Sequence, residues 1–190
     1  MELVLPSPIT RHRISAEQFQ KMAENGIFLP GERVELIDGN MIDMAPIGSF
    51  HCGTVCWLTQ TFMETSRGKA IVHIHNALRL SPIVEVYPDL ALLKPRADFY
   101  RSAHPGPDDV LLVVEVADSS AAFDRSVKAE LYARHAIPEY RIVDIPGRCI
   151  RYHHAPADGR YTEITATETP GPTAVPGLAG INVDLTEVFG

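Results

Sequence analysis

DVLLVVEVADSSAAFDRSVKAELY, residues 109–132, is the stretch that decides the fold of this 190-residue chain. Its first part, Val110–Val114, is apolar at both alternating positions, which is typical of a central strand buried on both faces. We expect Leu111 and Val113 to face one side of the sheet and Leu112 the other. The chain is therefore predicted to fold around this strand.

An acidic residue, Glu115, lies inside the same run and is followed by another valine. An ionised carboxylate at the end of a buried strand costs free energy unless a partner or a bound ion stabilises it. Asp118, Ser119 and Ser120 then end the strand. The sequence thus places a carboxylate at a buried strand end, just before a predicted helix.

In that helix, Phe123, Val127 and Leu131 recur every four residues and predict the stripe that faces the core. Lys128 lies about 100° round the helix axis, at the border of this stripe. It either leans toward Glu115 or forms an exposed i,i+4 pair with the acid four residues before it, worth a few tenths of a kcal/mol. The spacing alone leaves both interpretations open.

Composition and length indicate one globular domain. Hydrophobic residues make up 45% and charged residues 22% of the chain, so a sizeable core can form. We expect an N-terminal arm over residues 1–14 and a single domain over residues 15–190. The chain shows no run long enough for a membrane span and no signal-peptide layout at its start. Three cysteines do not make a disulfide framework, so a cytoplasmic location is expected.

The flanking segments predict an α/β fold with a mixed central sheet flanked by helices. The expected elements are helices at 16–24 and 50–65, a hairpin around Asp38-Gly39, strands at 70–75, 77–80 and 90–93, an antiparallel meander at 140–144, 149–153 and 160–164, and a helical turn at 184–189. The helix at 50–65 carries the apolar stripe Val55, Leu58, Thr59, Phe62 and Met63. Lys94–Asp108 is predicted to be a surface loop.

A second acid, Asp89, follows Pro88 and precedes the apolar run Leu90–Leu93. It therefore stands at the edge of a second buried strand, as Glu115 does at the end of the first. A third acid, Glu35, lies on the strand face opposite its apolar neighbours. It points either to solvent or into a pocket.

The histidines and cysteines give weaker signals. His51 falls in the first turn of a predicted helix, where a capping or packing role is the more common one. Cys52 and Cys56 lack the spacing of a zinc site and are interpreted as small core residues. His73 and His75 share a strand face, but a zinc site would need further ligands.

Asp89 and Glu115 together suggest a magnesium site. Two carboxylates on adjacent strand ends, with a backbone carbonyl such as that of Val116, suit Mg²⁺ or Mn²⁺, which prefer oxygen ligands and keep several waters. A bound ion acidifies water and offsets charge on a scissile phosphate. Lys128 beside it can orient or deprotonate that water and stabilise the transition state.

Five segments of the sequence resemble the Uma2 family of restriction-endonuclease-like proteins, in the PD-(D/E)XK nuclease superfamily. The segments are ELIDGNMIDMAP, the start of the helix at His51, YPDLALL, LLVVEVADSS and DRSVKAELYARHAIPEYRIVD. The resemblance covers residues 15–189. It implies a restriction-endonuclease-like α/β fold and a metal-dependent endonuclease that acts on DNA.

Position by position, the resemblance assigns the site. Pro88-Asp89 matches the PD element, Glu115 matches the second acid, and Glu35 matches an additional acid proposed for such sites. Ala117 stands where the superfamily motif has lysine, and Lys128 matches the displaced lysine of Uma2-like sequences. The segment ADSS also lacks the proline that is usual after the glutamate.

Alternatives to the endonuclease remain open at this point. One is a non-catalytic binding or assembly module that keeps the acids as buried groups, which the formal net charge of −7 favours. The other is a hydrolase or transferase that acts on a small phosphorylated substrate. For an endonuclease we also expect a homodimer, because cutting both strands of a duplex needs two sites.

Overall fold

The computed structural model describes residue 7 and residues 9–190. Residues 1–6 and 8, which make up half of the predicted arm, lie outside the described residues. In the described part of the chain, no helix has the length and apolar character needed to cross a membrane.

Six strands form one mixed sheet in the order β10-β9-β8-β7-β6-β3. Their bounds are β3 (Ile71–His73), β6 (Leu90–Leu93), β7 (Val110–Ala117), β8 (Glu139–Asp144), β9 (Cys149–Ala157) and β10 (Arg160–Thr167). β7 is buried along its whole length and runs parallel to β8, while the other neighbours in this sheet pair antiparallel. The predicted central strand and the C-terminal antiparallel meander are confirmed.

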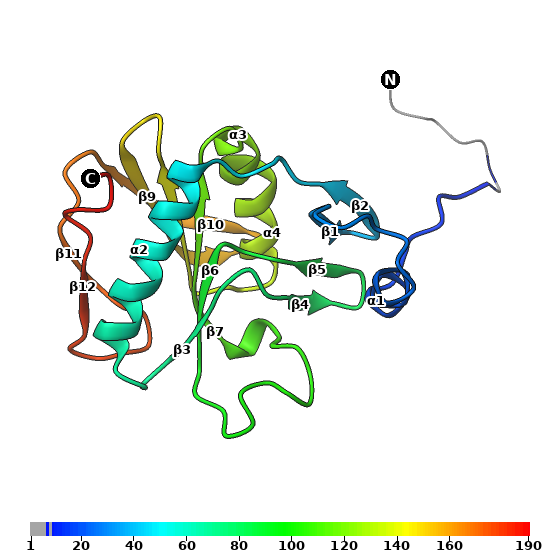
Figure 1. Cartoon of the computed structure of the whole chain (residues 1–190), viewed down its shortest axis with the longest axis horizontal. Helices are drawn as coiled ribbons and strands as arrows, with labels where there is room; N and C mark the ends of the chain where they lie inside the picture. Colours follow the sequence, from blue (N-terminus) through cyan, green and yellow to red (C-terminus); the bar gives the residue numbers. More distant parts are fainter. Residues whose placement is uncertain (1–6, 8) are drawn as a thin grey trace.

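Helices cover both faces of this sheet (Figure 1). Their bounds are α2 (Ser49–Ser66), α3 (Ala121–Phe123) and α4 (Ala129–Arg134), with a π-helical segment (Asp124–Lys128) joining the last two. α2 packs its Leu58 in one core cluster with Leu112, and α4 packs its Leu131 in another with Val113. The connection from β7 through α3 and α4 to the parallel strand β8 is the crossover that the sequence predicts.

A β-bulge corrects the predicted faces of β7. Leu92 pairs with Leu112, but Leu93 pairs with Val110, so Leu111 is an extra residue in the ladder. Leu111 therefore packs on the α2 side together with Leu112 and not beside Val113, as the simple alternation predicts. Beyond the bulge, strict alternation returns and turns Glu115 toward the face that α4 covers.

The π-helical segment corrects the predicted core stripe of the crossover helix. The N–H of Ala129 donates to the carbonyl of Asp124, five residues earlier, which widens the turn and shifts the residues that follow. As a result Val127 is 41% exposed, whereas Lys128 and Asp124 are buried. The interpretation of Asp124 and Lys128 as an exposed pair is therefore wrong.

α2 presents fewer residues to the core than its sequence predicts. Val55, Leu58 and Phe62 are buried, but Met63 is 59% exposed. Cys52 and Cys56, predicted to be core residues, are exposed. Their i,i+4 spacing places them on a common face that lies beside the buried one.

A second sheet and α1 (Ala16–Glu24) form a wing beside the main sheet (Figure 1). Its order is β2-β1-β5-β4, with bounds β1 (Val34–Ile37), β2 (Asn40–Asp43), β4 (Leu78–Ser81) and β5 (Val84–Val86). Phe19 of α1 packs against Leu36 of β1. β5 was not expected from the sequence, and it carries the chain directly to Asp89.

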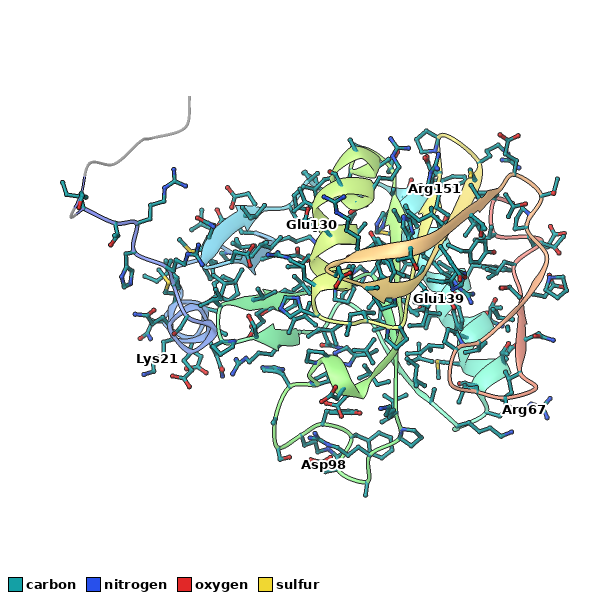
Figure 2. All side chains as sticks on the ribbon, turned by 180° about the vertical axis from the view of Figure 1, so that it is seen from behind. Lys21, Arg67, Asp98, Glu130, Glu139 and Arg151 are labelled. Carbon is teal, nitrogen blue, oxygen red and sulfur yellow. The ribbon has the colours of Figure 1, made fainter. Side chains whose placement is uncertain are left out.

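The remaining segments lie at the periphery. The loop after β6 extends away from the sheet with Asp98 at its tip (Figure 2) and ends in a 3₁₀ turn (Pro107–Asp109). A short hairpin, β11 (Pro172–Ala174) with β12 (Asn182–Asp184), packs near α2. Residues 186–189 form a turn in which the N–H of Val188 donates to the carbonyl of Leu185, where a helical turn was predicted.

The shifted helix face predicts different costs for two substitutions on the crossover helix. Leu131→Ala removes a fully buried side chain and should lower the free energy of unfolding by about 2–5 kcal/mol. Val127→Ala removes an exposed side chain and should change it by no more than about 0.5 kcal/mol. Urea denaturation of both variants measures this, and equal losses would contradict the π-helical shift.

Candidate functional site

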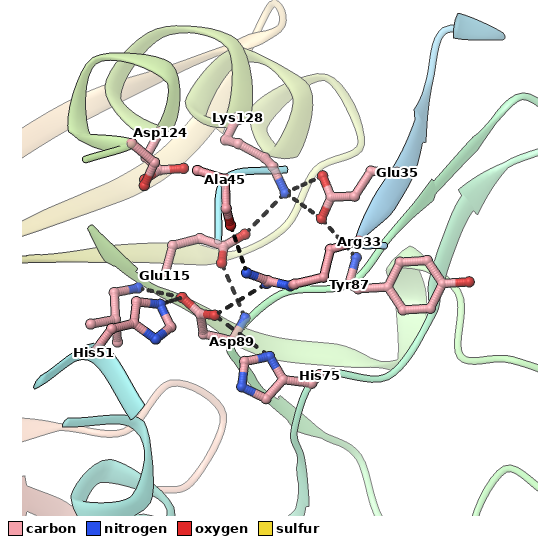
Figure 3. Close-up of polar contacts among 12 residues, drawn as sticks. Arg33, Glu35, Ala45, His51, His75, Tyr87, Asp89, Glu115, Asp124 and Lys128 are labelled. Carbon is pink, nitrogen blue, oxygen red and sulfur yellow. Dashed lines mark hydrogen bonds and ion pairs between the residues drawn. The ribbon is translucent and has the colours of Figure 1, made fainter. Parts of the chain in front are cut away.

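Four residues from distant parts of the chain meet where the wing joins the main sheet (Figure 3). Lys128 Nζ lies 2.6 Å from Glu35 Oε2 of β1 and 3.2 Å from Glu115 Oε1 of β7. Asp89, just before β6, lies beside Glu115 because the start of β6 meets the end of β7. The structure thus brings together all four side chains predicted from the sequence.

Backbone groups fix the two strand-end carboxylates. The N–H of Asp89 donates to Glu115 Oε2 at 3.1 Å, and the N–H of Val116 donates to Asp89 Oδ2 at 2.8 Å. Tyr132 donates its hydroxyl proton to Glu115 Oε1 at 2.9 Å. Each carboxylate is therefore held by the neighbouring strand, so its position follows from the strand pairing.

Three basic side chains surround Asp89. His51 Nε2 lies 3.1 Å from Asp89 Oδ2, while His75 Nδ1 and Arg33 Nη2 lie 3.6 Å and 3.8 Å from Asp89 Oδ1. Burial by itself raises the pKa of Asp89, but the hydrogen bonds from His51 and the Val116 N–H, with the charges of His51 and His75, hold that pKa below its ordinary value. Asp89 is thus an ionised carboxylate at neutral pH.

Glu115 and Lys128 respond to their surroundings in a different way. Burial raises the pKa of Glu115 to about 8, with Lys128 opposing the rise and Asp89 adding to it. Burial lowers the pKa of Lys128, but the charges of Glu115 and Glu35 outweigh burial and raise it above its ordinary value. Lys128 is therefore a fixed ammonium group, and the neutral amine needed to deprotonate water is not available.

The cluster carries more buried negative than positive charge. Asp124 lines the same cavity and is buried like the other three acids, and its pKa is raised by burial even though Ser120 donates a hydrogen bond to it. Four buried carboxylates thus face one buried ammonium group, while Arg33 and the two histidines add positive charge only at Asp89. A charge imbalance of this kind is relieved either by protonation, as the pKa of Glu115 indicates, or by a bound cation.

The cavity at this cluster suits a small hydrated ion. Its volume is about 40 Å³, enough for an ion with one or two waters since a water needs roughly 10–15 Å³. Asp89 Oδ1 accepts no hydrogen bond from the described residues, and His75 and Arg33 lie 3.6 Å and 3.8 Å from it. Over residues 9–190, no three His, Cys, Asp or Glu side chains are arranged to hold a metal. Two carboxylates with water suit Mg²⁺ or Mn²⁺, which prefer oxygen ligands.

Sequence reasoning missed the residues around the acids. His51, interpreted as a capping or packing residue, contacts Asp89, and Arg33 carried no signal at all. His73 and His75 do not share a site, because His73 contacts the carbonyl of Ala77 while His75 faces Asp89. A histidine in the first turn of a helix is compatible with many roles, so only the fold could reveal this one.

Comparisons with known proteins identify the family and the fold of the chain. The model of the Uma2 family, described as "Putative restriction endonuclease", matches residues 16–186. A solved structure titled as a "putative nuclease belonging to DUF820" from Anabaena variabilis has a TM-score of 0.69 at 13% identity, and the match covers 93% of this chain and 97% of that one. At this identity the likeness shows the fold alone. No curated protein matches the sequence.

The raised pKa of Glu115 predicts a pH-dependent stability difference. Unfolded Glu115 ionises near its ordinary pKa of 4.5, whereas folded Glu115 keeps its proton up to about pH 8, so folding becomes less favourable between these values. The raised pKa of Lys128 has no effect in this window, because both states keep that proton. In metal-free buffer, the free energy of unfolding of Glu115→Gln relative to wild type should therefore rise by roughly 1–4 kcal/mol from pH 5 to pH 8. A difference independent of pH would contradict the assigned environment.

Proposed function

The chain belongs to the Uma2 family, and from this and the charge imbalance of the site we propose that it is a metal-dependent endonuclease that hydrolyses DNA phosphodiester bonds. In this proposal Asp89 and Glu115 ligate Mg²⁺ or Mn²⁺, with the backbone carbonyl of Val116 as a further ligand. Glu35 supports the site through Lys128. The observation that carries the proposal is the cluster of four buried carboxylates around one ammonium group.

The residues of this chain have distinct roles in the proposed reaction. A bound divalent ion supplies an acidified water and offsets charge on the phosphate. Lys128 keeps its proton and so acts by its charge, orienting the water and stabilising the negative charge that develops on the phosphate. His51 and the Val116 N–H hold Asp89 ionised and in place. Glu115 must lose its proton before it ligates an ion.

The proposed partner is DNA, and the proposed assembly is a homodimer in the cytoplasm. A dimer supplies two sites, one for each strand of a duplex. The non-catalytic module remains the second candidate, because the acids are almost fully enclosed and each of Asp89 and Glu115 already has partners in the chain. A small phosphorylated substrate is less favoured, because the matching family is described as an endonuclease family.

Cleavage of supercoiled plasmid DNA in Mg²⁺ tests the endonuclease directly. The wild-type protein should convert the plasmid to linear product, and Asp89→Asn and Glu115→Gln should each lower the rate about 100-fold or more, because each removes a charged ligand. Glu130→Gln is the matched control, since Glu130 is exposed on the outer side of α4 (Figure 2) and should leave the rate unchanged. Product that is nicked but never linear would count against the dimer.

Calorimetric titration with Mg²⁺ or Mn²⁺ separates the enzyme from the module. At pH 7 the proposal predicts binding that releases protons, because burial raises the pKa of Glu115 in the metal-free protein. Glu115→Gln should abolish this binding. Equal plasmid cleavage by all variants would exclude Asp89 and Glu115 as metal ligands. If the wild-type protein binds neither ion, the non-catalytic module is favoured.

A further inference from the structure

A groove between α1 and the wing sheet opens beside the acidic cluster. Its volume is about 520 Å³, within the range of roughly 300–1,000 Å³ that small ligands occupy. We call it the aromatic groove and define it by Ala23, Phe28, Arg33, Met44, His75 and Tyr87, which line it. Of these residues, only His75 was considered for a binding role from the sequence, as a candidate zinc ligand.

The aromatic groove and the acidic cavity share a wall. Arg33, Glu35, Met44 and Tyr87 line both. The Tyr87 N–H donates to Glu35 at 3.0 Å, while the Tyr87 ring points away from Asp89 (Figure 3) and its hydroxyl donates to Glu85. The backbone and the hydroxyl of Tyr87 are thus each bound to a carboxylate, which fixes the ring in the lining of the groove.

The two sides of this wall differ in chemistry. Phe28 is half-buried against Phe19, with ring centroids 5.3 Å apart, and forms an apolar side of the groove. Arg33 and His75 lie at the boundary with Asp89. A ligand that fits has a flat aromatic part next to an anionic part, which describes a nucleotide with its base in the groove and its phosphate near Arg33.

Resting on the proposed function, we propose that the aromatic groove binds an unpaired nucleobase next to the phosphate that lies at Asp89 and Glu115. A paired base presents only its edges to a protein, whereas an unpaired base offers a face that can stack on Phe28 or Tyr87. The preferred substrate is therefore a duplex with an extruded base at the cleavage position, and a single strand serves as the simplest probe of the same base contact.

Fluorescence anisotropy with labelled single strands of about 12 nucleotides tests this proposal. One probe carries bases throughout and the other carries abasic deoxyribose, and Ca²⁺ replaces Mg²⁺ so that binding is measured. The wild-type protein should bind the base-containing strand about tenfold more tightly than the abasic strand, as expected for one stacked base. Equal affinity for the two strands would overturn the proposal.

Two variants locate the preference in the aromatic groove. Ala23→Trp fills the groove from an exposed position on α1, so the fold should tolerate it, and the tenfold preference should disappear. Phe99→Ala, which removes an aromatic ring that is 64% exposed on the loop after β6, should keep it. A preference that survives Ala23→Trp, with an unchanged melting temperature, would overturn the assignment.

The outcomes distinguish this inference from the function on which it rests. If the wild-type protein cuts plasmid DNA but binds both strands equally, only the proposal for the aromatic groove is contradicted. If the wild-type protein neither cuts plasmid DNA nor binds either strand, the proposed endonuclease function is contradicted as well.

Discussion

The contact on which the rest of the structure depends is the Lys128 ammonium group between two buried carboxylates. Glu35 is 93 residues away along the chain and Glu115 is 13 residues away, so one side chain joins the wing, the central strand and the crossover helix. Removing one member of such a buried set leaves a charge unpaired, which costs about 3–5 kcal/mol. The wing carries Arg33 and part of the aromatic groove, so this contact also positions the proposed substrate site.

The excess of buried carboxylates over buried cationic groups determines the chemistry of the site. A neutral buried network would be a structural feature and no more, but here the carboxylates outnumber the ammonium group, and the pKa of Glu115 is raised to about 8. Asp89 is held ionised by His51 and by the Val116 N–H, whereas burial raises the pKa of Glu115, although the two strand-end acids lie side by side. A divalent ion would ionise both. The same imbalance rules out Lys128 as a base, because its neighbours keep it protonated.

Sequence patterns that span a few residues predicted much of the fold and of the site. The apolar run of β7 predicted the central strand, and the acids at two strand ends predicted the meeting of Asp89 with Glu115. The bulge at Leu111 and the π-helical segment at Asp124–Lys128 were not predicted, because one extra residue in a ladder or a turn leaves no mark on sequence periodicity. Arg33 and His51 were missed because their roles depend on contacts between elements distant in the sequence. The family resemblance placed Lys128 correctly where helical periodicity left it undecided.

The central claim is that the buried acids form a divalent-cation site. Crystals grown or soaked in Mn²⁺ and measured near the manganese absorption edge test it most directly, because anomalous scattering locates the ion without regard to activity. We predict one strong peak within about 2.5 Å of carboxylate oxygens of both Asp89 and Glu115, with Lys128 still paired to Glu35. A peak elsewhere on the chain, or none in crystals soaked at saturating Mn²⁺, would contradict the account.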